Sequence, residues 1–137
     1  MTLNGGTLSM YDNVNTYNAS YWNLIVPVNS TASWNTDSRC DLYGSLTGGG
    51  TLNFKVTYVR TSLYGDWSDF DGQINVNGGG EFRVLNFNGY TGAAINLSSN
   101  NLMDFQGAVD PAGTTLQIGA LSGVSSSSLL GLSLIHI

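Results

Sequence analysis

Charged side chains are the scarcest class in this 137-residue sequence. They make up 9% of it, against roughly 25% in an average soluble domain. Only Arg39, Lys55, Arg60 and Arg83 are basic, and nine acidic residues bring the net charge to −5. Four dispersed cations cannot neutralise a run of phosphates, so the composition argues against a protein that binds nucleic acid.

Cysteine and long apolar runs are missing as well. Cys40 is the one cysteine, so no disulfide can form within the chain, and we expect it to be a small buried apolar residue. No run of eighteen apolar residues is present, so we expect no membrane insertion by this segment. The N-terminal MTLNGGTLSM lacks the basic start and apolar stretch of a signal peptide. For a secreted protein, the signal is therefore expected upstream of Met1.

Glycine, asparagine, serine and threonine fill most of the remaining polar positions. The sequence has 18 glycines. Glycine and asparagine tolerate left-handed backbone, and serine, threonine and asparagine bond to nearby backbone groups. The strong helix formers are few. This composition predicts an all-β fold made of short strands and tight turns, with no helix of three turns.

A turn followed by an alternating strand occurs four times, at Gly5–Met10, Gly49–Phe54, Gly79–Val84 and Ala112–Ile118. Further strands are expected at Leu24–Val28, Gly72–Val76, Ala93–Leu97 and Leu116–Ala120, each bounded by turn residues. Apolar and polar residues alternate within them, which predicts one buried and one wet face. The four copies of this turn-and-strand motif are about 30 to 45 residues apart, so each interval is expected to span one or two coils of a solenoid.

These patterns predict a fragment of a right-handed parallel β-helix over residues 1–131, with five or six coils of roughly 20–25 residues each. The alternative is an antiparallel β-sandwich, which also uses many short strands. The recurring turn phrases favour the solenoid. So does the asparagine beside many strand residues, because its amide can form a ladder between stacked coils. Pro27 indicates a strand edge or a coil corner.

Two segments carry a family resemblance. Gly44–Val76, GSLTGGGTLNFKVTYVRTSLYGDWSDFDGQINV, and Leu116–Gly123, LQIGALSG, resemble the autotransporter-associated β-strand repeats of bacterial autotransporter-like passenger regions. The similarity covers roughly Gly44–Gly123. It implies a right-handed parallel β-helix exposed at the bacterial cell surface or secreted. It implies no catalytic residues, because such repeats are architectural.

The C-terminal segment Leu132–Ile137 reads as a sequencing artefact. Its six residues, LSLIHI, are the translation of CTG TCT CTT ATA CAC ATC, the mosaic end of a transposase adapter used in sequencing libraries. We therefore predict that residues 132–137 are not native protein and expect no structural role for them. The only histidine, His136, is one of them.

Three aspartates form the one pattern that suggests a metal. Asp66, Asp69 and Asp71 precede Gly72, and several carboxylate oxygens in one turn could bind Ca²⁺. The spacing is not that of an EF-hand loop, and the bidentate glutamate is missing. The structural alternative is a turn in which aspartate side chains cap backbone N–H groups. That alternative is the stronger, so no metal or other cofactor is predicted.

Trp22, Trp34 and Trp67, with tyrosines such as Tyr21 and Tyr64, could stack against sugar rings. The alternative, which we favour, is that these rings fill the core.

No nucleophile, metal-ligand set or phosphate loop is recognisable, so the chain is not expected to be an enzyme. The function predicted is a structural or adhesive stalk segment of a surface-exposed or secreted bacterial protein. Its expected partners are neighbouring coils of a longer parent chain, and extracellular glycans are a further partner class. Two alternatives stay open: an accessory piece of a polysaccharide-degrading enzyme, and a carbohydrate-binding module.

Overall fold

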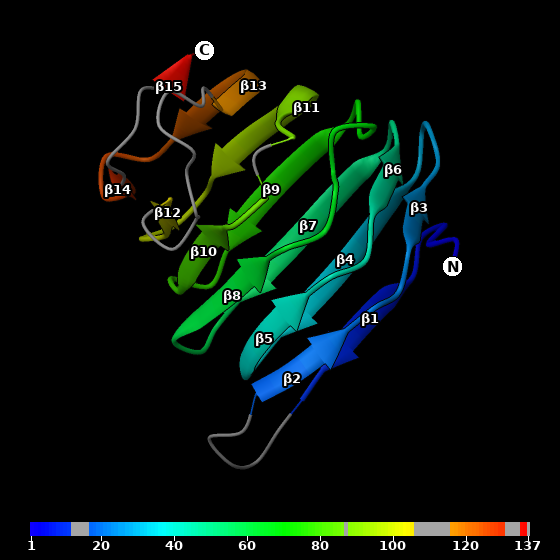
Figure 1. Cartoon of the computed structure of the whole chain (residues 1–137), viewed down its shortest axis with the longest axis horizontal. Coiled ribbons are helices and arrows are strands. Elements are labelled where there is room, and N and C mark those ends of the chain that lie inside the picture. The colour runs from blue at the N-terminus through cyan, green and yellow to red at the C-terminus, as the bar shows by residue number, and fades with distance from the viewer. Residues whose placement is uncertain (12–16, 87, 106–115, 131–134, 137) are drawn as a thin grey trace.

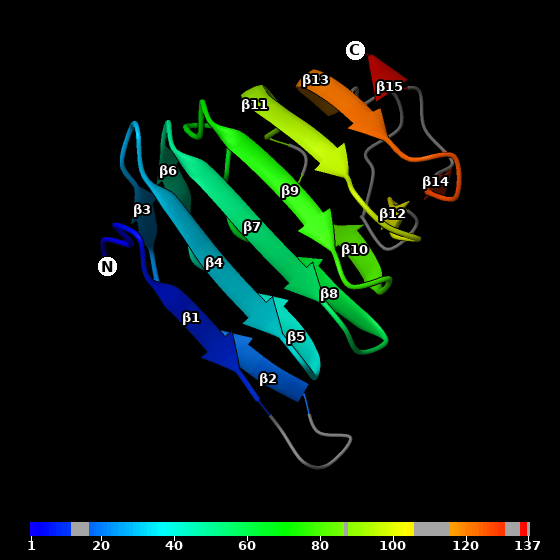
Figure 2. The same ribbon diagram turned by 180° about the vertical axis from the view of Figure 1, so that it is seen from behind.

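The computed structural model describes residues 1–11, 17–86, 88–105, 116–130 and 135–136. Every regular element in these ranges is a β-strand. Figures 1 and 2 show the strands of two larger sheets lying side by side in chain order, from the N-terminal end of the stack to the C-terminal end. No helix in the described residues is long and apolar enough to cross a membrane.

Three sheets form the walls of the molecule. The seven-stranded sheet has the order β1 (Thr7–Met10), β4 (Thr31–Thr36), β7 (Thr51–Val56), β9 (Gln73–Asn77), β11 (Tyr90–Leu97), β13 (Leu116–Gly123), β15 (Ile135–His136). The six-stranded sheet has the order β14 (Ser128–Leu130), β12 (Leu102–Asp104), β10 (Glu81–Val84), β8 (Arg60–Leu63), β5 (Arg39–Leu42), β2 (Tyr17–Ser20). The third sheet pairs β3 (Leu24–Val26) with β6 (Leu46–Gly48).

All the strand pairings in the described residues are parallel, and each joins one coil to the next. Thr31 pairs with Thr51, and Thr51 pairs with Gln73. The offset between register partners ranges from 19 residues, between Leu116 and Ile135, to 28 residues, between Tyr90 and Ile118, so coil length varies along the stack. This confirms the predicted parallel β-helix. The antiparallel sandwich is wrong.

The core follows from the strict alternation within each strand. In β7, Leu52, Phe54 and Val56 point inward and are fully buried, while Thr51, Asn53 and Lys55 face outward. Because the register is parallel, inward residues stack into columns, such as Leu52 over Ile74 over Ile95. A parallel β-helix thus buries one face of each sheet against the others.

Aromatic rings occupy the middle of this core. Phe54 lies 5.7 Å from Trp34, 6.0 Å from Trp67 and 5.5 Å from Phe82, measured between ring centroids. Trp67 also contacts Tyr90 at 6.3 Å. These edge-to-face contacts are an arrangement that aromatic rings favour, and they tie four coils together.

Polar ladders hold the outer face of the seven-stranded sheet. Asn53 and Asn75 are register partners, and the Asn75 amide donates to the Asn53 side-chain oxygen at 3.0 Å. Ser122 donates to Asn96 at 3.1 Å. The predicted asparagine ladder between coils is confirmed. Pro27 lies just after β3, in a corner where its carbonyl accepts the Ser30 amide at 3.1 Å, as predicted.

The repeated sequence phrase does not mark equivalent points of successive coils. Gly49–Phe54 leads into β7 of the seven-stranded sheet, whereas Gly79–Val84 leads into β10 of the six-stranded sheet. The phrase is a general turn-and-strand unit, so its spacing exceeds the true coil length. Ala112–Thr115, the start of the fourth copy, lies outside the described residues.

The C-terminal segment is described only at Ile135–His136, which pairs with Leu116 and Gln117 of β13. The rest of the predicted adapter translation, 132–134 and 137, lies outside the described residues. The origin of this segment stays a prediction.

Candidate functional site

Three tyrosines form an exposed stack along one corner of the coil stack, which we call the tyrosine ladder: Tyr21, Tyr43 and Tyr64. Ring centroids are 5.0 Å apart between the first two and 4.7 Å apart between the last two, with planes within 10°. Each tyrosine directly follows a strand of the six-stranded sheet, β2, β5 or β8. Parallel bonding continues past the strand ends, since the Tyr43 and Tyr64 amides donate to Ser20 and Leu42 at 2.8 Å.

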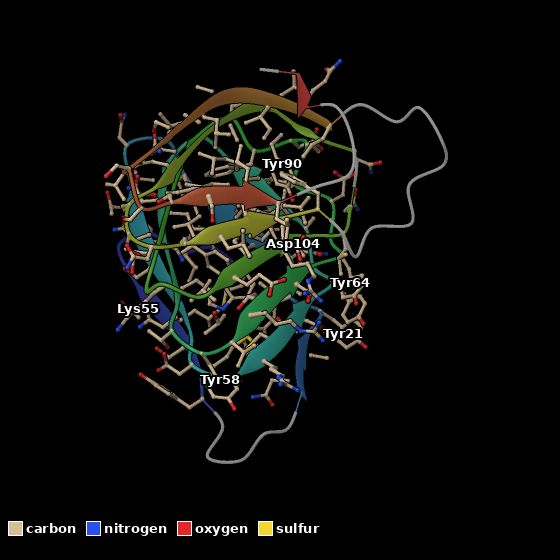
Figure 3. The ribbon with its side chains drawn as sticks, turned by 90° about the vertical axis from the view of Figure 1, so that its left-hand side faces the viewer. Tyr21, Lys55, Tyr58, Tyr64, Tyr90 and Asp104 are labelled. Atoms are coloured by element: carbon tan, nitrogen blue, oxygen red, sulfur yellow. The ribbon has the colours of Figure 1, made fainter. Side chains whose placement is uncertain are left out.

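The ladder is open to solvent, with exposures of 71%, 42% and 40% in chain order. Figure 3 shows Tyr21 and Tyr64 on the same side of the molecule, opposite Lys55. Partial desolvation raises the pKa of Tyr43, and the neighbouring Asp41 carboxylate and tyrosines raise it further. Tyr43 therefore stays a neutral phenol that can donate and accept hydrogen bonds.

Beside the ladder, the outer face of the six-stranded sheet carries three of the four basic residues of the chain, together with three carboxylates. Outward positions alternate along each strand, so Arg39 and Asp41 precede Tyr43, and Arg60 and Ser62 precede Tyr64. The next strand places Glu81 opposite Arg60, and Arg83 opposite Ser62. We call this surface the charged face, made of Arg39, Asp41, Arg60, Ser62, Glu81, Arg83 and Asp104.

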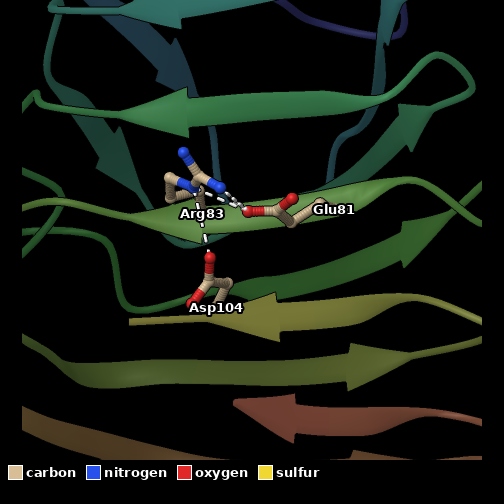
Figure 4. A network of polar contacts seen from close by, with 3 residues as sticks. All are labelled: Glu81, Arg83 and Asp104. Carbon is tan, nitrogen blue, oxygen red and sulfur yellow. Dashed lines mark hydrogen bonds and ion pairs between the residues drawn. The ribbon is translucent and has the colours of Figure 1, made fainter. Parts of the chain in front are cut away.

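A guanidinium bridges two carboxylates at the C-terminal end of the charged face (Figure 4). The Arg83 Nε donates to Glu81 at 2.6 Å and to Asp104 at 3.2 Å, and a second Arg83 nitrogen also pairs with Glu81. The Asp104 side chain is only 3% exposed, so it depends on this cation. Burial raises the pKa of Glu81, the adjacent Asp104 carboxyl adds to the increase, and Arg83 opposes it.

The three aspartates considered as Ca²⁺ candidates, Asp66, Asp69 and Asp71, are not brought together as ligands. Asp66 accepts the Ser68 amide at 3.0 Å and the Asn88 side-chain amide at 2.6 Å, and these bonds lower its pKa. Asp66 is therefore a capping residue of its turn. Asp69 and Asp71 are exposed. Within the described residues, no three histidine, cysteine or acidic side chains lie close enough to hold a metal ion.

The tryptophans divide between core and surface. Trp34 and Trp67 are 2% and 1% exposed, so their ring faces are not open to a sugar. Trp22 is 52% exposed and directly follows Tyr21, which corrects the expectation that all three fill the core. The same correction applies to Tyr21 and Tyr64, because their positions follow strand ends at a corner.

Cys40 lies inside the coil stack, 1% exposed, as the sequence predicts. Its sulfur is 3.3 Å from the Ser38 hydroxyl, and burial raises the pKa of the thiol. A protonated, buried thiol is unreactive, so it contributes to packing rather than to chemistry.

Sequence reasoning missed the part played by Tyr43 and the assembly of the charged face. The available signal was the spacing of Tyr21, Tyr43 and Tyr64, which are 22 and 21 residues apart. That spacing equals one coil, but it becomes informative only once the coil length is known.

The C-terminal end of the coil stack leaves core positions uncovered. Phe82, Met103 and Leu129 are successive register partners, yet Leu129 is 45% exposed while the other two are fully buried. Leu121 likewise continues the column of Ile95. Around them lies a cavity of about 260 Å³ lined by Leu97, Leu121, Gly123, Val124, Ser127 and Leu129.

No family model, curated protein or solved structure matches this chain. The resemblance of Gly44–Val76 to autotransporter-associated repeats therefore stays a prediction.

Proposed function

We propose that this chain is a structural stalk segment of a surface-exposed or secreted bacterial protein, without catalysis of its own. Its work is to build length, by stacking coils that hold other parts of a longer chain away from the cell. The bacterial surface location comes from the sequence resemblance, and the spacer role from the geometry of the coils.

One observation carries the proposal. The core columns run to the C-terminal end of the stack, where Leu121 and Leu129 stand in inward positions without full cover. The outer edge of β14 (Ser128–Leu130) has no partner among the described strands. Partly exposed apolar side chains and an unpaired strand edge at this end can bind another coil. Repeat proteins bury their core only through neighbouring repeats.

Low charge supports the same role. Gatekeeper charges near an exposed strand edge suppress edge pairing, but β14 and the neighbouring turn, Gly123–Leu130, contain no charged residue. A second chain can therefore stand in for the next coil. We expect the protein to associate end to end and to form rods of constant width.

Sedimentation velocity over a concentration series, with electron microscopy of the larger species, tests this role. The wild type should form species that grow with concentration, and Leu121→Lys with Leu129→Lys should return it to monomer without loss of the β-sheet circular dichroism signal. Val59→Lys is the matched control, because Val59 is 49% exposed in mid-stack. A wild type that stays monomeric at high concentration, or a control that disperses the species equally, would contradict the proposal.

A further inference from the structure

The tyrosine ladder and the charged face form one continuous surface with a repeating chemistry. Along β5 and its extension the outward residues are Arg39, Asp41 and Tyr43, and the next coil repeats the arginine and the tyrosine as Arg60 and Tyr64, with the buried Ser62 between them. Successive coils in a parallel sheet lie about 4.8 Å apart. An arginine and a tyrosine therefore recur at this interval on two successive coils, which suits a ligand that is itself a repeating polymer.

The charge of this surface points to an uncharged ligand. Its three guanidiniums face three carboxylates, and Arg83 is already paired with Glu81 and Asp104. The remaining net charge of the molecule is negative. A polyanion would be repelled overall, and a polycation would find two of the three carboxylates of this surface, Glu81 and Asp104, already paired with Arg83. Neutral hydroxyl groups, in contrast, can form hydrogen bonds with guanidiniums and with carboxylates, because each hydroxyl both donates and accepts.

The ladder supplies the apolar side of such a site. Both faces of the Tyr43 ring are covered by its neighbours, so the ladder presents ring edges and phenol oxygens along its length. One ring face of Tyr21 is free of the stack, and the exposed Trp22 stands beside it in sequence. Aromatic rings give apolar area with a polar edge, which matches the apolar face and hydroxyl rim of a pyranose ring.

We infer that this surface binds a strand of an uncharged polysaccharide lying along the coil stack. Its hydroxyls pair with the Arg39, Asp41 and Arg60 groups, and its apolar ring faces lie against Tyr21 and Trp22. The ladder fixes the border of the site, since three stacked rings lose little freedom on binding. This role goes beyond the proposed spacer function and does not depend on it, because the surface lies on the side of the stack and not at its end.

The test is affinity electrophoresis of the full chain in native gels that contain mixed-linkage β-glucan, glucomannan or xyloglucan, with polygalacturonate as the charged counterpart. We expect retardation by at least one of the three neutral polymers. Tyr43→Ala and Arg60→Gln should each weaken that binding by at least about tenfold. Tyr11→Ala is the matched control, because Tyr11 is 68% exposed and follows β1 on another sheet.

Tyr43→Phe removes only the hydroxyl and keeps the ring, so it distinguishes the contributions of the two groups to binding. It should lose less affinity for the polysaccharide than Tyr43→Ala. Circular dichroism of each variant reports folding, and Arg60→Gln, which lies outside the ladder, keeps the test decisive if Tyr43→Ala unfolds. Retardation by none of the neutral polymers, retardation by polygalacturonate alone, or equal loss in the Tyr11→Ala control would each overturn the inference. Association through the open end is measured separately, so failure here leaves the spacer role standing.

Discussion

Replacing Gly65 with alanine should be among the most damaging single changes in this protein. A Cβ at Gly65 would lie 1.9 Å from the Gly44 carbonyl oxygen and 2.9 Å from that of Tyr43, both backbone atoms of the preceding coil. Real Cβ contacts essentially never fall below 3.0 Å, so the two coils would have to separate by roughly 1 Å, about a fifth of the ~4.8 Å spacing between strands.

The loss in free energy of unfolding can be estimated from the hydrogen bonds and packing that this separation would disrupt. The Tyr64 and Gly65 amides donate to the Leu42 carbonyl at 2.8 and 2.9 Å, and two weakened backbone bonds cost about 1–3 kcal/mol. Overpacking adds about 1–3 kcal/mol. We expect a loss of about 2–6 kcal/mol, a large fraction of the roughly 5–15 kcal/mol that typically holds a domain together.

Two further glycines serve as internal controls. A Cβ at Gly6 or Gly79 would meet nothing within 4 Å, but Gly79 has φ +79°. Gly79→Ala should therefore cost about 1–2 kcal/mol from backbone conformation alone, and Gly6→Ala should be neutral or stabilising by up to about 1 kcal/mol. Guanidinium unfolding followed by tryptophan fluorescence gives the three values. If Gly65→Ala cost no more than Gly79→Ala, the close approach of the coils would be refuted.

The remaining predictions concern the core, the turns and the tail. Phe54→Ala should cost about 3–5 kcal/mol in the same unfolding assay, because the side chain is fully buried among three other rings; a loss below 1 kcal/mol would contradict this placement. The pKa of Asp66 is lowered, chiefly by the Ser68 amide, so its stabilising effect should be present above the ordinary carboxyl pKa and disappear as pH falls through the lowered value. Asp66→Asn should remove that pH dependence, and an unchanged profile of stability against pH would argue against the cap. Cys40 should react with a thiol reagent only after unfolding, and rapid labelling of the native protein would show that it is not buried. Deleting Leu132–Ile137 should leave the melting temperature unchanged, whereas a large drop would show that the segment packs as native structure.

The fold could be predicted from local chemistry, but the coil length could not. Alternating apolar residues and turn-forming Gly and Asn specify strands and corners wherever they occur. The phrase at Gly49–Phe54 and its copy at Gly79–Val84 look alike because both turn into a strand, although they enter different sheets. The strands can therefore be predicted from the local residue pattern, whereas the register between coils depends on packing inside the core.

The same limit explains the candidate site. Arg83 and Asp104 are 21 residues apart, and they meet only because β10 and β12 pair in that register. Trp22 and Trp34 are the same residue type, but Trp22 lies in the corner between β2 and β3 and is exposed, whereas Trp34 is at an inward position of β4 and is buried. The three aspartates near Gly72 formed the clearest local motif, yet Asp66 caps its own turn. A site assembled across coils leaves little local signal.

Disulfide cross-linking of register partners tests the parallel coil stack most directly. Asn53 and Asn75 pair across β7 and β9, and their side chains are in contact at 3.0 Å. Strand neighbours lie about 4.8 Å apart, which is within the usual 4.4–6.8 Å range for the Cα atoms of a disulfide. In a Cys40→Ala background, Asn53→Cys with Asn75→Cys should form an intramolecular disulfide under mild oxidation. Asn53→Cys with Asn77→Cys, displaced by two residues, should not. Efficient cross-linking of the displaced pair, with none in the register pair, would contradict the parallel β-helix.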